Sequence, residues 1–298
     1  MGHYNNKVTQ LPSSDVIELE RYDWAIGGYV KTGQTINGFT NSVYGDKNVL
    51  TAVGSALGSF YGWQTQTGKN GSIVFADEAE ASTATTASPD GHLKYNTNAG
   101  GMVNFKSGDV HFVDQNGDGV IDDNDKVVIG NPNPDIFGNI FTSLTWKDLR
   151  LDVFFKYSLG NDVYNYQRSV IEGLNTTYNQ SPAATRRWTY EGQVTDLPRA
   201  CYTNSEDWRN NERMSDRWIE DGSFLKLKNV RLTYKIPYRN NWLLGLKVWG
   251  EANNLFTLTR YLGTDPEMSC RNNAMYQGID TGMIPAGRSF NMGVTINL

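Results

Sequence analysis

The architecture follows from two runs of residues, Ile136-Phe-Gly-Asn-Ile-Phe-Thr-Ser-Leu-Thr-Trp146 and Leu149-Arg-Leu-Asp-Val-Phe-Phe-Lys-Tyr-Ser-Leu159. In both runs the apolar residues recur at every second position, which is typical of β-strands. Only Lys147 and Asp148 separate the runs, so the sequence predicts a β-hairpin with a two-residue turn. Strands of about ten residues are long enough to cross a bilayer when tilted. We therefore expect a membrane-spanning hairpin.

An acidic loop precedes this hairpin, with the sequence Asp114-Gln-Asn-Gly-Asp-Gly-Val-Ile-Asp-Asp-Asn-Asp125. Its carboxylate and amide side chains have the spacing of an EF-hand calcium loop, with Gly119 at the sharp turn. The predicted metal ligands are the side chains of Asp114, Asn116, Asp118, Asp122 and Asp125 and the backbone carbonyl of Val120. We expect Ca²⁺ as a structural ion.

Two features of the loop depart from an EF-hand. Its last ligand position holds Asp125 instead of a longer glutamate, and Pro132 and Pro134 oppose a following helix. An Asp/Asn/Gly turn stabilised by side-chain to backbone hydrogen bonds, with no bound ion, is the alternative.

Five motifs together resemble the C-terminal third of the SusC/RagA family of TonB-linked outer-membrane proteins. In chain order they are Gly58-Ser-Phe-Tyr-Gly62, Phe112 to Pro134, Asp221-Gly-Ser-Phe-Leu-Lys-Leu-Lys-Asn229, Asn253-Asn-Leu-Phe-Thr257 and Ser289 to Leu298. The resemblance covers nearly the whole chain. It implies an all-β fold, namely the C-terminal portion of a large antiparallel transmembrane β-barrel, with long extracellular loops that carry short helices.

Composition limits the function classes. The 298 residues are 39% hydrophobic and 12% aromatic, with 16 Tyr, 8 Trp and 30 Gly, which fits many strands and turns. No stretch approaches the roughly 18 apolar residues of a membrane helix, but barrel strands would show none because half of their residues are polar. A net charge of −5 without a basic stripe argues against a nucleic-acid partner.

The chain divides into three parts in this interpretation: residues 1–108 with weak strands and a long polar loop, residues 109–134 with the acidic loop, and residues 135–298 with barrel strands and extracellular loops. Within the first part, Trp24 to Val30 and Gly58 to Thr67 look strand-like, and Gly68 to Gly108 is expected to be loop with one helical turn at Ala76 to Ala81.

The third part alternates strands with connections. Gly222 to Pro237, Gly245 to Arg260 and Arg288 to Leu298 are predicted strands, and the apolar phase slips near Lys228 and Asn229, which predicts a β-bulge. The connections at 147–148 and 238–244 are short, whereas 160–220 and 261–285 are long, with short helices expected near Tyr166 and Ser181. Short connections that alternate with long ones are typical of outer-membrane barrels, in which the short turns are periplasmic and the long loops are extracellular. Five clear strands cannot close a barrel, so an open, incomplete sheet is expected.

The resemblance implies a TonB-dependent outer-membrane transporter that imports glycans, peptides or other nutrients with a SusD-like surface lipoprotein, in contact with outer-membrane lipid. Its TonB box and plug are expected upstream of Met1, because Met1 to Lys7 carries no secretory signal. Substrate-binding residues cannot be assigned from the sequence. The alternative function is a secreted calcium-binding β module for adhesion or glycan binding.

No catalytic constellation stands out. His3, His92 and His111 lie in unrelated segments, and no GxSxG, HExxH or P-loop pattern occurs, so no enzyme is expected. Cys201 and Cys270 form either one disulfide or two free thiols. Leu298 departs from the aromatic residue that usually ends such barrels. A set of loop aromatics is expected either to contact sugar or a partner or to pack within the loops: Tyr178, Trp188, Tyr202, Trp208 and Tyr276.

Overall fold

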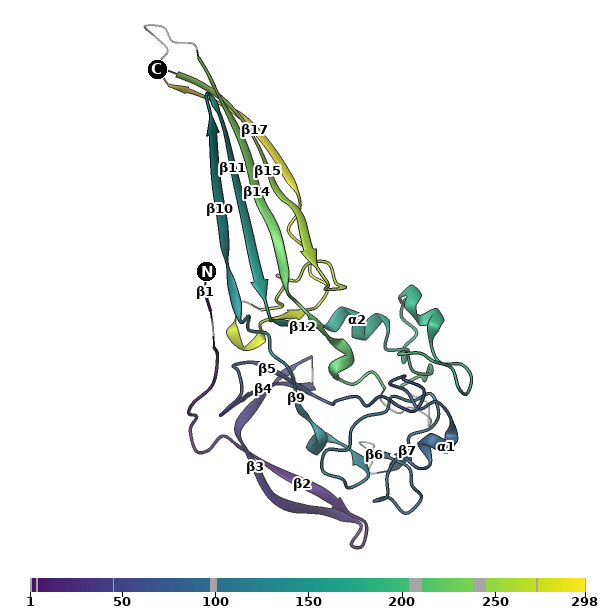
Figure 1. The fold of residues 1–298 in the computed structure, drawn as a ribbon. Helices are drawn as coiled ribbons and strands as arrows, with labels where there is room; N and C mark the ends of the chain where they lie inside the picture. The colour runs from purple at the N-terminus through teal and green to yellow at the C-terminus, as the bar shows by residue number, and fades with distance from the viewer. Residues whose placement is uncertain are drawn as a thin grey trace.

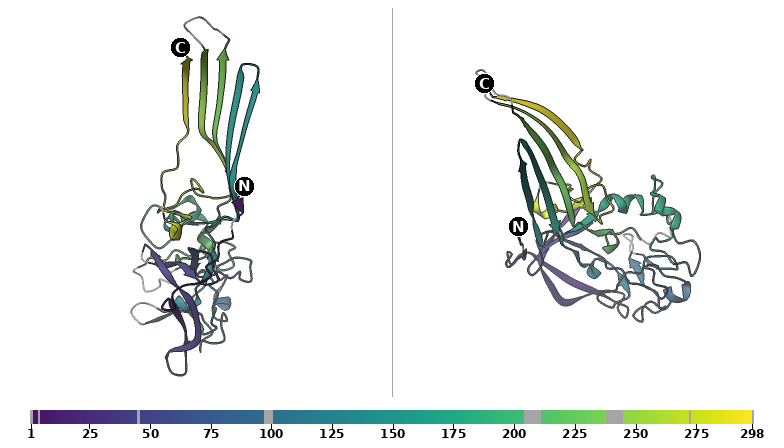
Figure 2. Two further views of the ribbon diagram at one scale, coloured as in Figure 1. Left: turned by 90° about the vertical axis from the view of Figure 1, so that its left-hand side faces the viewer. Right: turned by 45° about the horizontal axis from the view of Figure 1, so that its top comes forward.

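The computed structural model describes residues 2–3, 5–44, 46–96, 101–203, 211–237, 245–271 and 273–297. A long, curved sheet extends from one end of a lobe built of loops, short strands and the longer β2–β3 hairpin (Val16–Asp23 and Gly28–Val43) (Figure 1). The views in Figure 2 show the same two parts, with the N-terminus where the sheet meets the lobe and the C-terminus at the far tip of the sheet. Trp208, Leu298 and the expected turn at 238–244 lie outside the described residues.

The sheet is open and has six strands in the order β1-β10-β11-β14-β15-β17, with every neighbouring pair antiparallel. The strands are β1 (Gly2–His3), β10 (Ile136–Trp146), β11 (Leu149–Leu159), β14 (Phe224–Ile236), β15 (Gly245–Thr259) and β17 (Ser289–Asn297). The structure thus confirms the all-β fold class and the incomplete antiparallel sheet.

The predicted hairpin and bulge are both present. Trp146 pairs with Leu149, so only two residues form the turn, and Lys147 takes a left-handed conformation with φ of 54°. In the pairing of β14 with β11, Phe154 pairs with Asn229 and Phe155 pairs with Leu227, so Lys228 is an extra residue on β14. Because of this extra residue, the apolar side chains of β14 lie on the same face of the sheet before and after the bulge, although their positions in the sequence shift by one, as the sequence indicated.

The two faces of the sheet differ in chemistry. One row across the strands consists of Ser143, Asp152, Arg231, Glu251 and Asn291, and the adjacent row consists of Leu144, Leu151, Leu232, Gly250 and Met292. Because side chains alternate along a strand, these rows point to opposite faces. The apolar face is not covered: Leu144 is 60% exposed and Met292 is 90% exposed. Such a continuous apolar exterior is unusual for a soluble monomer.

The lobe contains the remaining strands. One antiparallel sheet, in chain order, is formed by β2 (Val16–Asp23), β3 (Gly28–Val43), β4 (Asp46–Ala52), β5 (Ser59–Gly62) and β9 (Val127–Gly130). Two smaller sheets are formed by β6 (Lys94–Asn96), β7 (Met102–Asn104) and β8 (Val120–Ile121), and by β12 (Asp162–Asn165), β13 (Ile219–Asp221) and β16 (Ile279–Asp280).

Helices are few and short. The α-helices are α1 (Glu78–Ala81) and α2 (Tyr166–Ile171), and the 3-10 helices are Asp123–Asp125, Pro182–Arg186, Asp216–Trp218 and Ala274–Tyr276. The short helix expected near Ser181 is thus present as Pro182–Arg186, and the Ser181 side chain caps it by accepting a hydrogen bond from the Ala183 N–H. None of the helices in the described ranges has the length and apolarity needed to cross a membrane.

The two largest buried clusters among the described residues hold the lobe together. The first contains Trp63, Val74, Phe75, Ala81, Leu93, Phe105, Val110, Phe112 and Ile121, so it draws on residues from both sides of position 108. The second joins three segments that are separated in the chain by sheet strands, through Val43, Val49, Phe60, Tyr164, Met214, Trp218 and Ile279. All three long connections between the sheet strands therefore pack into one lobe.

Several expectations for the first 108 residues were wrong in detail. Trp24 to Gly27 forms a turn instead of a strand, and the long strand β3 follows it. The strand expected over Gly58 to Thr67 is limited to Ser59–Gly62. Residues 68–108 are mostly loop with a helical turn at Glu78–Ala81, as expected, but Val74, Phe75, Leu93 and Phe105 are almost fully buried. Their apolar residues are too scattered in the sequence to form a periodic pattern.

Cys201 and Cys270 are not joined by a disulfide bond in the structure. Cys201 is buried, and Cys270 is half-buried against the second cluster. The disulfide alternative is therefore not formed.

Candidate functional site

The acidic loop crosses the lobe between the first buried cluster and β9. Gly117 and Gly119 have φ values of 70° and 82°, the left-handed conformation that glycine adopts without steric cost. The sharp turn predicted at Gly119 is thus present. The loop ends in a 3-10 helix, Asp123–Asp125, that is followed by the strand β9 and not by an EF-hand helix.

Backbone N–H groups of the loop donate hydrogen bonds to its own carboxylates. Oδ1 of Asp114 accepts from Gly117 at 2.7 Å, and Oδ2 accepts from Gly119 at 2.7 Å. The Asp125 carboxylate accepts from Gln115 at 2.9 Å and from Asp122 at 2.8 Å. The loop therefore contains the side-chain to backbone hydrogen bonds that are typical of an Asp/Asn/Gly turn.

The loop also concentrates negative charge in a buried place. Asp125 is fully buried, and its burial raises its pKa to about 8. The nearby carboxylates of Asp114, Asp122 and Asp118 raise this pKa further, whereas the hydrogen bond from the Asp122 N–H lowers it. Burial also raises the pKa of Asp118. Close carboxylates that are shielded from water disfavour ionisation unless a cation accompanies them.

Contacts made by the loop fix the β2–β3 hairpin to the lobe. Nε1 of Trp24, in the hairpin turn, donates to the carbonyl of Asp118 at 2.7 Å, and the Tyr22 N–H donates to the Asp118 side chain. On its other side, Nε1 of Trp63 donates to the carbonyl of Asp122 at 2.7 Å. The loop is thus a structural joint between the hairpin and the first buried cluster.

The predicted ligands lie in one loop, but their convergence on an ion stays a prediction. Asn116 and Asp118 are linked by a 3.0 Å hydrogen bond, and Val120 lies in β8, beside β6. Among the described residues, no group of three or more His, Cys, Asp or Glu side chains is arranged to hold a metal ion. Calcium would therefore require carboxylate oxygens to exchange some backbone N–H partners for the ion.

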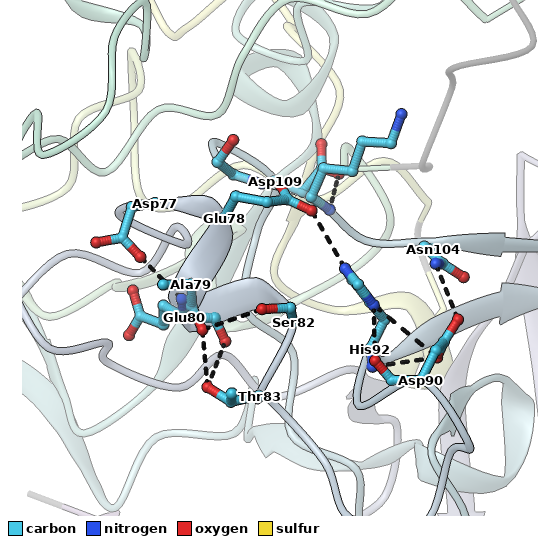
Figure 3. A network of polar contacts seen from close by, with 12 residues as sticks. Asp77, Glu78, Ala79, Glu80, Ser82, Thr83, Asp90, His92, Asn104 and Asp109 are labelled. Atoms are coloured by element: carbon cyan, nitrogen blue, oxygen red, sulfur yellow. Dashed lines mark hydrogen bonds and ion pairs between the residues drawn. The ribbon is translucent and has the colours of Figure 1, made fainter.

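The histidines of the lobe have structural partners. Nε2 of His92 lies 3.2 Å from the Glu78 carboxylate, and Nδ1 lies 3.1 Å from the carbonyl of Asp90 (Figure 3). Figure 3 also shows Asn104 bonded to Asp90, which joins β7 to the turn before His92. The ring of His111 stacks on Phe75, and burial lowers its pKa.

A second polar cluster, which the sequence did not reveal, lies where the polar face of the sheet meets the lobe. Glu267, from the connection between β15 and β17, lies 2.8 Å from Lys156, 2.7 Å from Lys226 and 2.8 Å from Lys228. Asp265 lies 2.6 Å from Lys226. Burial opposes ionisation of Glu267, but the hydrogen bonds from the three lysines outweigh it and lower its pKa to about 2. This ion cluster ties the last long connection to the polar face.

The loop aromatics divide into two groups. Tyr178 and Tyr202 are exposed, at 70% and 49%. Trp188 packs against the first buried cluster and Tyr276 packs against the second. Packing within the lobe therefore accounts for Trp188 and Tyr276, whereas Tyr178 and Tyr202 face solvent.

Comparison with known proteins shows that the chain is similar to TonB-dependent receptors. A scan against protein-family models finds no match. The TonB-dependent receptor P3 of Formosa agariphila is 28% identical over 299 residues, which covers 98% of this chain and 25% of the receptor. The TonB-dependent receptor SusC of Bacteroides thetaiotaomicron is 27% identical over 198 residues, which covers 62% of this chain and 17% of SusC.

The fold has a counterpart among solved structures. The RagAB peptide importer in its closed-closed state superposes with a TM-score of 0.58 at 20% sequence identity, over 90% of this chain and 26% of the importer chain. This likeness concerns the fold, and the chain spans about a quarter of the length of the Formosa receptor. The motifs and the relatives agree: the chain is similar in sequence to TonB-dependent receptors, SusC among them, and similar in fold to RagAB.

Proposed function

We propose that this chain forms part of the wall and the extracellular lobe of an outer-membrane, TonB-dependent importer of oligosaccharides, peptides or similar nutrients. The observation that carries the proposal is the contrast between the two faces of the sheet. The exposed row with Leu144, Leu232 and Met292 suits lipid, and the row with Asp152, Arg231 and Glu251 suits a water-filled interior.

The arrangement of connections supports the orientation. Residues 147–148 form a short turn at the tip of the sheet, whereas the long connections pack together at the other end. In outer-membrane barrels the short turns are periplasmic and the long loops are extracellular. The lobe would therefore face the outside of the cell, where nutrients and surface partners are met.

A SusD-like surface lipoprotein is the proposed partner, and transport rather than catalysis is the proposed activity. The relatives named above are receptors, and the solved counterpart is a peptide importer. Exposed Tyr178 and Tyr202 offer amphipathic rings to a partner or a substrate on the extracellular side. The alternative of a secreted β module has no support, because its apolar sheet face would be left in water.

A pair of adjacent substitutions tests the membrane location. Met292→Lys places a charge in the middle of the apolar face of β17, and Asn291→Lys places the same charge on the polar face. In a bilayer, Met292→Lys should cost about 2–4 kcal/mol and reduce membrane assembly, whereas Asn291→Lys should have a much smaller effect. Heat-modifiable mobility on gels after expression of the whole receptor measures assembly. Equal assembly of both variants would overturn the proposal. Met292 is exposed, so a lysine at this position would have no effect if the apolar face were in water instead of lipid.

We also propose that the acidic loop binds Ca²⁺ as a structural ion. Two observations support this: the spacing of the oxygen-bearing side chains, and the full burial of Asp125 beside three other carboxylates. The ion would bridge the carboxylates and hold the joint between the β2–β3 hairpin and the lobe. If a calcium titration up to millimolar concentration leaves the thermal midpoint unchanged, the calcium proposal is wrong and the loop is a hydrogen-bonded turn without an ion.

A further inference from the structure

The apolar face of the sheet carries a shallow groove at the end nearest the lobe. Its volume is about 610 Å³, and it crosses β10, β11, β14 and β15 before reaching the short strand β13 of the lobe. The apolar part of the lining comes from side chains on the outward face of these strands: Ile140, Tyr157, Leu159, Leu225 and Leu258. The groove is therefore continuous with the face proposed to contact lipid.

The apolar lining of the groove is open to the surroundings. Ile140 is 51% exposed, Leu159 is 46% exposed and Leu258 is 60% exposed. Leu225 stands opposite both Tyr157 and Leu258 in the strand register, so the groove is bounded by side chains from three neighbouring strands. A long hydrocarbon chain can fill such a shape without losing any hydrogen bond.

The lobe end of the groove is polar. Asp221, Ser223 and Arg260 line it there, and the Asp221 carboxylate accepts a hydrogen bond from the Ser223 N–H at 2.9 Å. Arg260 follows directly after β15 and is exposed; its positive charge helps to lower the pKa of the Asp221 carboxyl, but no salt bridge within 4 Å is formed by Arg260 in the described part of the chain. An arginine guanidinium has five N–H donors in a planar array that matches the oxygens of a phosphate group.

We propose that this groove is a binding site for a phosphate-bearing membrane lipid, with an acyl chain along Ile140, Leu225 and Leu258 and the phosphate on Arg260. The inference rests on the proposed membrane location. The order of chemistry along the groove matches that of a lipid in the extracellular leaflet: hydrocarbon beside the sheet, then an anionic group where the lobe begins. A protein segment fits less well, because a partner covering these strands would have to displace lipid from the same continuous face.

Native mass spectrometry of the whole receptor in detergent tests the site with two probes, dioleoyl phosphatidylglycerol and the phosphate-free dioleoylglycerol. The wild-type receptor should retain phosphatidylglycerol at least fivefold more than dioleoylglycerol. Arg260→Gln should remove this preference. The matched control is Arg288→Gln, an exposed arginine next to β17 that does not line the groove, and it should keep the preference. Leu258→Trp, which fills the groove, should reduce retention of both probes.

Equal retention of the two probes by the wild type, or an unchanged preference in Arg260→Gln, would overturn the lipid site. Heat-modifiable mobility of the same preparations is independent of lipid retention. A receptor that assembles in the membrane but shows no preference contradicts only the lipid site, and a receptor that does not assemble contradicts the proposed function itself.

Discussion

The carboxylate of Glu267 lies 2.7 Å from Nζ of Lys226, a lysine whose side chain is only 3% exposed. Because Lys156 and Lys228 contact the same carboxylate, one glutamate holds the connection between β15 and β17 onto two strands of the sheet. Removing it would leave buried positive charge with less compensation, which is costly in a region of low dielectric constant.

Glu267→Gln should therefore destabilise the protein by about 1.5–3 kcal/mol at pH 7, the range found for hydrogen bonds to charged groups. The pKa of Glu267 is lowered from its ordinary 4.5 to about 2, so its stabilisation is complete above pH 4.5 and is lost as the pH falls through 2. The wild type should lose stability across this window, and the variant should lose less. Chemical unfolding of the whole receptor in detergent at several pH values measures the difference. Parallel pH profiles for the two proteins would contradict this account.

Asp125 should produce the opposite pH dependence. Its pKa is raised to about 8 in the folded protein, so stability is greatest below the unfolded value of about 4 and is lost as the pH rises through 8. In the absence of divalent ions, the slope contributed by this group reaches at most about 1.4 kcal/mol per pH unit. Asp125→Asn should remove that slope, and Asp196→Asn, at an exposed position in the lobe, serves as the control. A slope that persists in Asp125→Asn would show that other groups cause it.

Calcium should change the behaviour of the same residue. A bound cation favours the ionised carboxylate, so millimolar Ca²⁺ should raise the thermal midpoint of the wild type by several degrees and flatten its pH slope between 4 and 8. Asp118→Asn and Asp125→Asn should each reduce the calcium response. A calcium response that is equal in the wild type and in both variants would place the ion elsewhere.

Trp24 should control the mobility of the β2–β3 hairpin. Trp24→Phe keeps an aromatic ring but removes the N–H that donates to the carbonyl of Asp118, which should cost about 1 kcal/mol. Hydrogen exchange in β2 and β3 should become faster, while exchange in β10 and β11 stays unchanged. Ile26→Ala is a suitable control because Ile26, in the same turn, is 65% exposed. Equal exchange rates in Trp24→Phe and the wild type would mean that the joint does not restrain the hairpin.

The long sheet could be predicted from the sequence because the residue pattern that specifies each strand lies within that strand. Alternation along Ile136 to Trp146 and Leu149 to Leu159, with a two-residue turn between them, sets strand length, register and the outward face together. The bulge at Lys228 was likewise visible as a change of phase within one strand. The membrane faces are readable for the same reason, since lipid and water select side chains at alternate positions.

The lobe could not be predicted in the same way. Val74 and Phe75 meet Phe105 and Phe112 through connections without regular periodicity, and β3 alternates weakly because it carries many Thr, Asn and Gln residues. Likewise, Lys226 and Glu267 are 41 residues apart, and only the folded connection brings them together. For the acidic loop, the sequence located the ligand types and the turn at Gly119, but the competition between an ion and the backbone N–H groups depends on three-dimensional geometry.

The parallel pairing of β12 with β16 links the lobe to the connection that leads into β17. Tyr164 pairs with Ile279, and the Trp63 backbone bridges to Ser215, so segments separated by more than a hundred residues complete one another. Ile279 lies in β16, within the connection that leads into β17. One stretch of chain therefore supplies both the edge of this small lobe sheet and the outermost strand of the long sheet, so a change in that connection would disturb the two sheets together.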